Sequence, residues 1–318
     1  MTVQHQNTAG VAVEEPRAVR GRAALSEGKR QERRLGWLLC APAATVMVVV
    51  TAYPILYSLW LSFQRYDLKF PNEKKFVGLA NYATVLSNGY WWSAFGVTVL
   101  ITVVSVVVEL VLGMALALLM HRTVIGRSLV RTSALIPYGI VTVVAAFSWR
   151  YAWTPGTGYL ANLVTPNGAP LTDRADALGI IILAEIWKTT PFMALLLLAG
   201  LALVPDDLLK AASMDGASWW QRFTKVMLPV MKPAILVALL FRTLDALRVF
   251  DNIYVLTNGA NETSSVSMIA YNNLMKGLNL GIGSTMSVLI FLAVAIIAFI
   301  FVKLFGTAAP GSSDDGRR

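Results

Sequence analysis

Six long apolar stretches limit what this chain of 318 residues can fold into more than any other feature. A helix needs roughly 20 apolar residues to cross the hydrocarbon core of a membrane, which is about 30 Å thick. The stretches that meet this length cover residues 36–61, 93–120, 129–153, 178–203, 234–256 and 284–305. They are apolar on all faces, which favours helices over strands. The sequence therefore predicts an all-α polytopic membrane protein with six transmembrane helices.

The composition agrees with this class. Hydrophobic residues make up 56% of the chain and charged residues 14%, whereas soluble domains carry about 25% charged residues. The net charge of +9 comes from basic residues beside the apolar stretches, so we expect membrane lipids rather than nucleic acid as its partner. One cysteine and two histidines leave no intrachain disulfide and no Cys/His metal cluster.

The basic residues also predict an orientation. Of the 27 Lys and Arg residues, 17 fall on the side of the N-terminus and seven on the other side. Because Lys and Arg concentrate in inner loops, both termini are expected in the cytoplasm. We expect a disordered basic tail over residues 1–34, the membrane domain over 35–306, and a cytoplasmic C-terminal tail over 307–318.

The longest inner loop, residues 204–233, begins with a predicted helix. Pro205 suits its first position, Asp206 and Asp207 complement the positive end of the helix dipole, and Gly216 supplies a left-handed stop. Its apolar face consists of Leu208, Leu209, Ala211, Ala212 and Met214. Such a helix either docks in a groove of another protein or lies on the membrane surface, where Trp219 and Trp220 would act as headgroup anchors.

The loop contains the run Lys210-Ala211-Ala212-Ser213-Met214-Asp215-Gly216-Ala217, then Trp220-Gln221, then Val226-Met227-Leu228-Pro229. This pattern resembles the EAA loop of binding-protein-dependent ABC permeases. The resemblance implies a coupling helix that sits in a cleft of a cytoplasmic ATPase. Lys210 departs from the family, which usually has glutamate there. The coupling residues implied are Leu208, Leu209, Lys210, Ala211, Ala212, Ser213, Met214, Asp215, Gly216 and Ala217.

Two more stretches extend the resemblance to the maltose-type sugar permeases. Residues 76–82, Phe-Val-Gly-Leu-Ala-Asn-Tyr, are similar to the family's outer-loop signature. Residues 250–259 resemble the end of the family's fifth span, although Ala260 replaces a second glycine often found there. The resemblance covers most of residues 35–306 and implies the type I ABC importer permease fold.

The resemblance also implies the partners and the location. It predicts a non-enzymatic subunit of the bacterial inner membrane that carries a carbohydrate, such as the disaccharide trehalose. Its partners would be a second homologous permease, two copies of a cytoplasmic ATPase, and a periplasmic or lipid-anchored sugar-binding protein. We expect no cofactor on this chain, and ATP with Mg on the ATPases, because the sequence lacks G-x-x-x-x-G-K-[ST].

Four charged residues stand in the fifth apolar stretch: Arg242, Asp245, Arg248 and Asp251. Their signs alternate at a spacing of three, so on one helix each can reach its neighbour. Charges in a membrane are costly and need partners or a water-lined cavity. The four thus form either a structural ladder or part of a cavity that binds sugar hydroxyls. The candidate pathway residues are Asp251, Asn252, Tyr254, Arg248, Asp245 and Glu109.

Other charges leave alternatives open. Glu185 and Lys188 have the same spacing and are expected to form a structural pair. Glu109 has no local partner, so it either faces a cavity or pairs with a basic group on another helix. An ion-coupled secondary transporter, with Glu109 or Asp245 as proton carrier, is the competing function. An intramembrane enzyme is disfavoured because H-E-x-x-H and G-x-S-x-G are absent.

Overall fold

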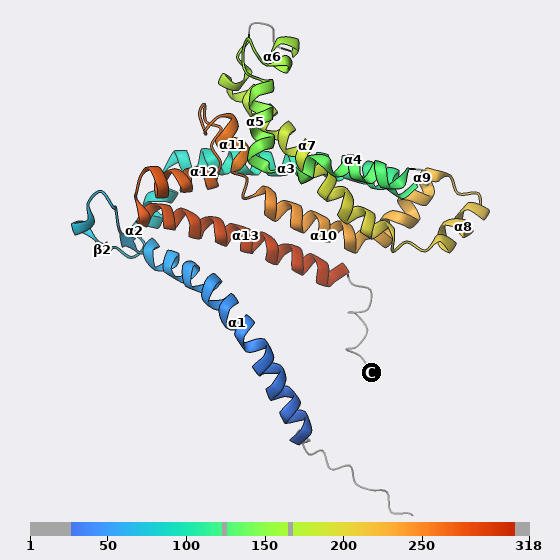
Figure 1. The fold of residues 1–318 in the computed structure, drawn as a ribbon, viewed down its shortest axis with the longest axis horizontal. Coiled ribbons are helices and arrows are strands. Elements are labelled where there is room, and N and C mark those ends of the chain that lie inside the picture. The colour runs from blue at the N-terminus through green and yellow to red at the C-terminus, as the bar shows by residue number, and fades with distance from the viewer. Residues whose placement is uncertain (1–26, 123–125, 165–167, 309–318) are drawn as a thin grey trace, which may run out of the picture. The chain divides into compact units, whose positions relative to one another are not determined.

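The computed structural model describes residues 27–122, 126–164 and 168–308 and is largely helical (Figure 1). The chain divides into two units, Met1–Ile55 and Leu56–Arg318. Five of the described helices are long and apolar enough to cross a membrane, and a bent pair of helices makes up to six. They are Arg34–Ser62, Gly89–Arg122, Arg174–Leu201, Trp219–Leu256 and Leu280–Lys303, with the bent pair Ser128–Gly139 and Thr142–Ala152.

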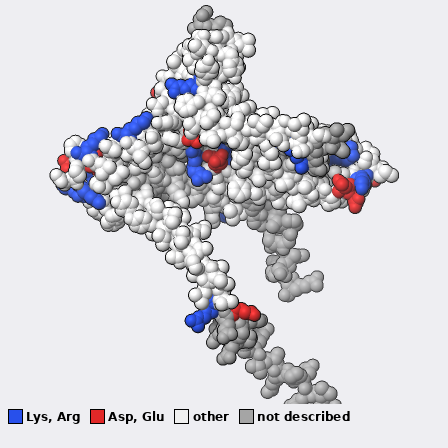
Figure 2. All heavy atoms as spheres, viewed as in Figure 1, with Lys and Arg blue, Asp and Glu red and all other residues white. Residues whose placement is uncertain are grey.

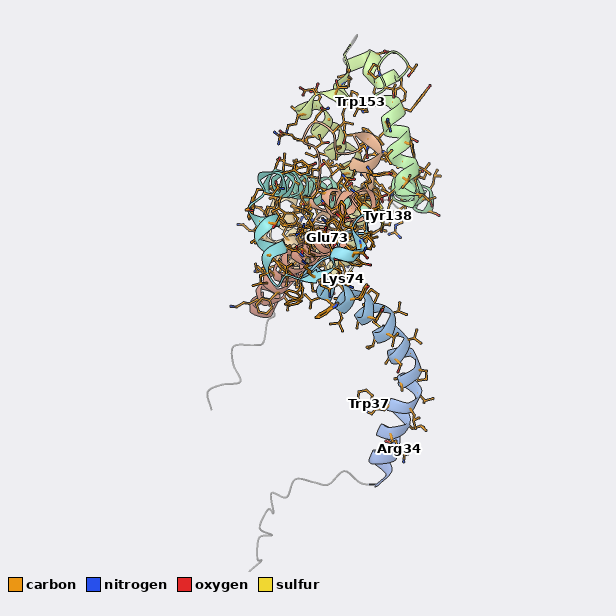
Figure 3. The ribbon with its side chains drawn as sticks, turned by 90° about the vertical axis from the view of Figure 1, so that its left-hand side faces the viewer. Arg34, Trp37, Glu73, Lys74, Tyr138 and Trp153 are labelled. Carbon is orange, nitrogen blue, oxygen red and sulfur yellow. The ribbon has the colours of Figure 1, made fainter. Side chains whose placement is uncertain are left out.

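The first unit contains most of helix α1 (Glu27–Ser62). Its side chains stand out along the helix, Arg34 and Trp37 among them (Figure 3). The helix begins at Glu27, within the predicted tail of residues 1–34, and the earlier part of that tail lies outside the described residues. The same holds for residues 309–318 of the predicted C-terminal tail.

The core of the second unit is built on α3 (Gly89–Arg122) and α7 (Arg174–Leu201), which pack along each other. Gly113 permits their close approach, because a Cβ there would lie 2.8 Å from Cγ of Met193. Helix α10 (Leu228–Ala246) packs on both, and Gly200 meets Ala234 in the same way, with a Cβ that would lie 2.6 Å from the alanine Cβ. Small residues at helix contacts are typical of membrane proteins.

A short hairpin follows α1. Strand β1 (Gln64–Arg65) pairs antiparallel with β2 (Lys75–Phe76), with the turn η1 (Pro71–Glu73) between them and α2 (Ala80–Leu86) after them. The side-chain amide of Asn81 donates to the carbonyls of Ser62 at 2.9 Å and Gln64 at 2.8 Å. The signature at residues 76–82 therefore fixes the turn at the end of α1.

The opposite end of the second unit carries α8 (Asp206–Met214) and α9 (Trp219–Arg222), far from β2 and α2 in Figure 1. The π-helix η3 (Phe223–Met227) links α9 to α10. Helix α13 (Leu280–Ala308) packs against α10 and α12 (Val266–Tyr271), and the π-helix η4 (Asn272–Lys276) leads towards it.

The third predicted span is not one helix, so the prediction for residues 129–153 is wrong in that respect. Helix α4 (Arg127–Gly139) and helix α5 (Thr142–Ala152) are bent by 85° at residues 140–141. Pro137 and Gly139 end α4, because proline removes a helical hydrogen bond and glycine is a poor helix former. Figure 3 shows Tyr138 at the foot of α5 and Trp153 at its far end. Helix α6 (Tyr159–Val164) and the turn η2 (Pro170–Thr172) complete the excursion.

The fifth predicted span, 234–256, is also interrupted. Helix α10 ends at Ala246, and α11 (Asp251–Leu256) begins after residues 247–250, where Phe250 has φ −142° and ψ −57°. Breaks in membrane helices leave backbone groups that must be satisfied locally. The hydroxyl of Ser265 donates to the carbonyl of Val249 at 2.8 Å and so meets this need.

Candidate functional site

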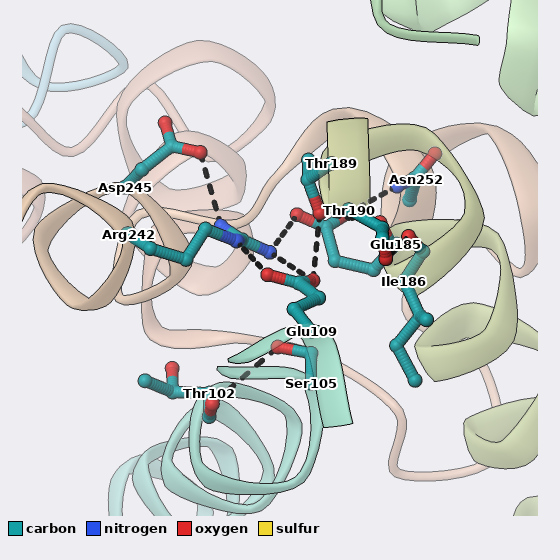
Figure 4. Close-up of polar contacts among 10 residues, drawn as sticks. All are labelled: Thr102, Ser105, Glu109, Glu185, Ile186, Thr189, Thr190, Arg242, Asp245 and Asn252. Carbon is teal, nitrogen blue, oxygen red and sulfur yellow. Dashed lines mark hydrogen bonds and ion pairs between the residues drawn. The ribbon is translucent and has the colours of Figure 1, made fainter. Parts of the chain in front are cut away.

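Arg242 on α10 is the centre of a buried ion network (Figure 4). Its side chain is fully buried, and its Nε and Nη2 donate to the two carboxylate oxygens of Glu109 on α3. The same Nη2 lies 3.0 Å from Oε1 of Glu185 on α7. Of the two alternatives for Glu109, the structure gives the second: it pairs with a basic group on another helix. The guanidinium therefore joins three helices.

The network extends towards the helix break. Nη1 of Arg242 donates to Asp245 at 3.0 Å, and the side-chain amide of Asn252 on α11 donates to Oε2 of Glu185. Arg248 instead donates through Nε to the carbonyl of Leu244 at 3.3 Å. Of the expected charge ladder, only the first pair forms among the described residues. The ladder needs a continuous helix, and α10 ends before Arg248.

Lys188 does not pair with Glu185, so that prediction is wrong. Its Nζ donates to the carbonyl of Ile140 at 2.7 Å and reaches that of Tyr138 at 3.4 Å. These carbonyls stand at the break between α4 and α5, where no helical hydrogen bond is available to them. Lys188 therefore holds the bent pair against α7, while Glu185 is engaged by Arg242 and Asn252.

A cavity of about 550 Å³ lies where the two helix breaks meet α7. Figure 2 shows a mixed group of acidic and basic side chains at the foot of α5, amid a largely uncharged surface. The lining residues are Tyr138, Ile140, Val141, Thr142, Glu185, Lys188, Thr189, Asp245, Arg248, Val249, Phe250, Asp251 and Asn252. Pockets of this size, with convergent polar groups, suit small-molecule ligands.

The cavity separates the predicted pathway residues into two groups. Asp245, Arg248, Asp251 and Asn252 line it. Among the described residues, no ion pair joins Asp251 to a basic group, and the Asp245 side chain keeps 61% of its surface exposed despite its bond to Arg242. These two carboxylates can therefore accept hydrogen bonds from a ligand.

The remaining two pathway candidates lie elsewhere. Glu109 is fully buried in the network. The ring of Tyr254 stacks on the ring of Phe250. Neither lines the cavity. Sequence reasoning did not select Tyr138, Phe250 or Thr142 as site residues, although Pro137 gave a signal for a helix interruption near the first of them. Phe250 stands directly before the charged residue Asp251, in the break between α10 and α11, and it lines the cavity.

The predicted coupling helix is present as α8. Pro205 is its N-cap rather than its first helical residue, and Asp206 and Asp207 stand in the first turn. At its end Gly216 has φ +79°, and the amide of Ala217 donates to the carbonyl of Ala212 at 2.9 Å. These two features are typical of a helix that ends at a glycine. Residues next to each end of α8 in the sequence therefore set where the helix begins and ends.

The α8 side chains divide into two sets. Leu209 is half-buried and packs against the buried cluster that contains Met227 and Met231. Leu208 is 48% exposed and Met214 89% exposed, so both are free to contact a partner. Lys210 forms an exposed ion pair with Asp207 at 3.5 Å. Of the two leucines in the predicted docking face, only Leu208 is presented outwards.

The two Trp residues that follow α8 pack against other side chains of this chain. Trp219 stacks on Phe223 with ring centroids 5.5 Å apart, and the guanidinium of Arg122 lies 5.2 Å from its ring. Ser218 and Gln221 form a capping box at the start of α9. Trp220 remains 62% exposed. These contacts hold the loop against the end of α3 and the π-helix η3 that leads into α10.

Comparison with known proteins gives consistent similarities. Residues 109–308 match the family described as "Binding-protein-dependent transport system inner membrane component". The chain is 67% identical to the trehalose transport system permease protein SugA of Mycobacterium tuberculosis, over 90% of this chain and 93% of that protein. It is 41% identical to the trehalose/maltose transport system permease protein MalF of Thermococcus litoralis, over 88% and 96% of the two chains.

The fold matches solved structures as well. A chain of a bacterial ABC transporter involved in the import of the acidic polysaccharide alginate superposes with a TM-score of 0.77 at 22% identity, covering 88% of this chain and 99% of that chain. A second structure of a bacterial alginate transporter, in complex with a periplasmic protein bound to alginate pentasaccharide, gives a TM-score of 0.75 at 20% identity. The architecture described above is thus that of a type I ABC importer permease.

Proposed function

This chain belongs to the family of binding-protein-dependent transport system inner membrane components, and on that premise we propose that it is the trehalose-carrying permease subunit of an ATP-driven importer. One observation carries the proposal: 67% identity over 90% of the chain to a trehalose transport permease. The chain is a transport subunit and not a catalytic one.

The other subunits would supply what this chain does not contain. A second, homologous permease would complete the translocation pathway, and a periplasmic or lipid-anchored sugar-binding protein would deliver the substrate. Two cytoplasmic ATPases would bind ATP and Mg, with no cofactor on this chain. With both termini in the cytoplasm, α8 lies on the inner side, where it would dock through Leu208 and Met214 in an ATPase cleft.

The cavity gives the sugar a place on its way through. Sugar hydroxyls both donate and accept hydrogen bonds, so they would donate to Asp245 and Asp251 and accept from Arg248 and Lys188. Closure of the ATPases on ATP would move α8, and the helices connected to it would then open the cavity to the other side by a rigid-body change. The two helix breaks lie on this cavity and would allow its walls to move.

The test is reconstitution. We expect the chain, co-purified with its second permease and ATPases in mild detergent and placed in liposomes, to take up trehalose only when loaded binding protein outside and ATP inside are both present. Uptake that continues without ATP and stops when an ion gradient is collapsed would support the ion-coupled alternative. In that alternative Glu109 or Asp245 carries a proton, but Glu109 is already held by two bonds from Arg242.

A further inference from the structure

Three arginines near the end of the second unit that carries α8 pair with no carboxylate of the described chain. Arg122 is the last residue of α3, Arg131 lies in the second turn of α4, and Arg222 is the last residue of α9. The Nε atoms of Arg131 and Arg222 are buried, and neither donates a hydrogen bond to another described residue. A buried donor without an acceptor lowers stability, so we expect an acceptor from outside the chain at these arginines.

The three arginines belong to helix ends that meet at this end of the unit. The guanidinium of Arg122 lies 5.2 Å from the ring of Trp219, which is the first residue of α9, and Arg222 follows one turn later. Residues 123–126 link Arg122 to the start of α4, so these two helix ends are at most roughly 18 Å apart. Figure 2 shows basic side chains over this end of the unit. The positive charges are therefore concentrated in one region.

Two exposed Trp side chains stand beside the arginines. Trp219 is 40% exposed and Trp220 is 62% exposed. Trp219 and Arg122 are also terminal residues of helices that are long and apolar enough to cross a membrane, Trp219–Leu256 and Gly89–Arg122. A residue at the end of such a span stands at the level of the lipid headgroups. Trp is enriched at this level because its ring is apolar and its N–H group is polar.

A lipid phosphate fits these groups better than an acidic protein surface does. The guanidinium group of arginine binds phosphate oxygens through two parallel hydrogen bonds. The arginines stand at the ends of spans and beside exposed Trp rings, not on α8, which would meet the ATPase. In the proposed orientation this end lies in the cytoplasmic leaflet, whose anionic lipids attract basic residues. The charge, the rings and the depth in the membrane therefore all favour an anionic lipid.

We propose that Arg122, Arg131 and Arg222 form a binding site for the headgroup of an anionic phospholipid such as phosphatidylglycerol. Trp219 and Trp220 lie beside its glycerol and the upper part of its acyl chains. The inference goes beyond the proposed function and does not depend on which sugar is carried. Only residues 215–218 separate α8 from α9, so a lipid bound here also steadies the loop that carries α8.

The experiment measures lipid binding directly, on the full-length chain purified with the subunits that accompany it. Native mass spectrometry follows the binding of added phosphatidylglycerol and of phosphatidylcholine, which has no net charge. Arg131→Gln and Arg222→Gln each remove a positive charge, whereas Arg131→Lys and Arg222→Lys keep it. Lys75→Gln is the matched control, because Lys75 is exposed on β2, far from α8 (Figure 1).

We expect each glutamine variant to weaken phosphatidylglycerol binding by about fivefold, the effect of one basic residue at an anionic membrane surface. The lysine variants should lose less affinity, because the charge remains although the planar guanidinium is gone. Phosphatidylcholine binding should be the same in all variants, and Lys75→Gln should bind phosphatidylglycerol as wild type does. Added inorganic phosphate should not displace the lipid, because it has no acyl chains to contact the Trp rings.

Four results would overturn the inference while leaving the proposed function standing. The first is wild-type affinity for phosphatidylglycerol in both glutamine variants. The second is an equal loss in Lys75→Gln, which would indicate general attraction between charges and not a site. The third is loss of the ATPase from the purified complex with unchanged lipid binding, which would assign the arginines to the protein interface. The fourth is ready displacement of the lipid by inorganic phosphate, which would indicate a site for a free anion.

Discussion

The middle of the second unit and its α8 end differ in where their side chains find partners. Around Arg242, the charges find partners inside the chain: one buried guanidinium is bound by three carboxylates from α3, α7 and α10. On α8, Leu208 and Met214 are exposed and have no place in the buried clusters. The Arg242 network is therefore formed within the chain, whereas the exposed side chains of α8 need a partner to cover them. Substitutions in the first should therefore change stability, and those in the second should change assembly.

The largest effect is expected at Arg242. Arg242→Ala leaves Glu109 and Glu185 as buried carboxylates without their cation, so the free energy of unfolding should fall by about 3–5 kcal/mol. Thermal unfolding and yield of the purified complex measure this. Arg248→Ala is the matched control, because Arg248 bonds only to a backbone carbonyl among the described residues. Equal losses in the two variants would contradict the central position given to Arg242.

A smaller effect is expected on α8. Replacing Leu208 and Met214 together by serine should lower the amount of ATPase recovered with the chain by about tenfold. These exposed side chains would make their apolar contacts only with the ATPase, so the substitutions remove contacts from the complex alone. The stability of the membrane subunits should not change. Recovery of the ATPase in undiminished amount would remove α8 as the docking element.

Leu209→Ser is the control for the Leu208 and Met214 substitutions, because it changes the α8 leucine that packs inside the chain. Leu209 packs against the cluster of Met227 and Met231, so this change should lower the unfolding temperature of the membrane subunits. A variant that keeps its unfolding temperature but loses the ATPase would place Leu209 in the docking face after all.

The smallest effect is expected at the border of the network. Asp251→Ala should lower trehalose uptake severalfold, roughly the loss of one hydrogen bond to a charged group. It should leave the unfolding temperature unchanged, because Asp251 has no ion pair among the described residues. Asn252→Ala is the comparison, since it removes the bond to Glu185 and should lower stability. Normal uptake by Asp251→Ala would remove Asp251 from the site.

Much of the fold follows from local properties of the sequence. Long stretches that are apolar on all faces favour helices in lipid, because a helix satisfies its own backbone groups. The α8 helix was also predictable, since its acidic first turn and its left-handed glycine act within a few residues. For Glu109 the sequence left two alternatives, a cavity or a basic group on another helix, and three basic residues in the spans could have supplied that group.

The partners of the charges were decided only by the tertiary structure. On an unbroken helix, Arg242, Asp245, Arg248 and Asp251 would have paired in order, and the same spacing favoured Glu185 with Lys188. The breaks at residues 140–141 and 247–250 changed both sets, because freed carbonyls attracted Lys188 and the end of α10 carried Arg248 out of register. Spacing along a helix predicts neighbours only while the helix continues.

The sequence by itself thus determined the membrane class, the apolar stretches, the α8 element and the family, all of which depend on composition or on residues close together in the chain. The tertiary structure alone decided which carboxylates Arg242 binds, which residues line the cavity, and which α8 leucine is exposed. These depend on how α3, α7 and α10 pack and on where two helices stop. That packing brings together residues more than a hundred positions apart, such as Glu109 and Arg242, whose contact no local pattern records.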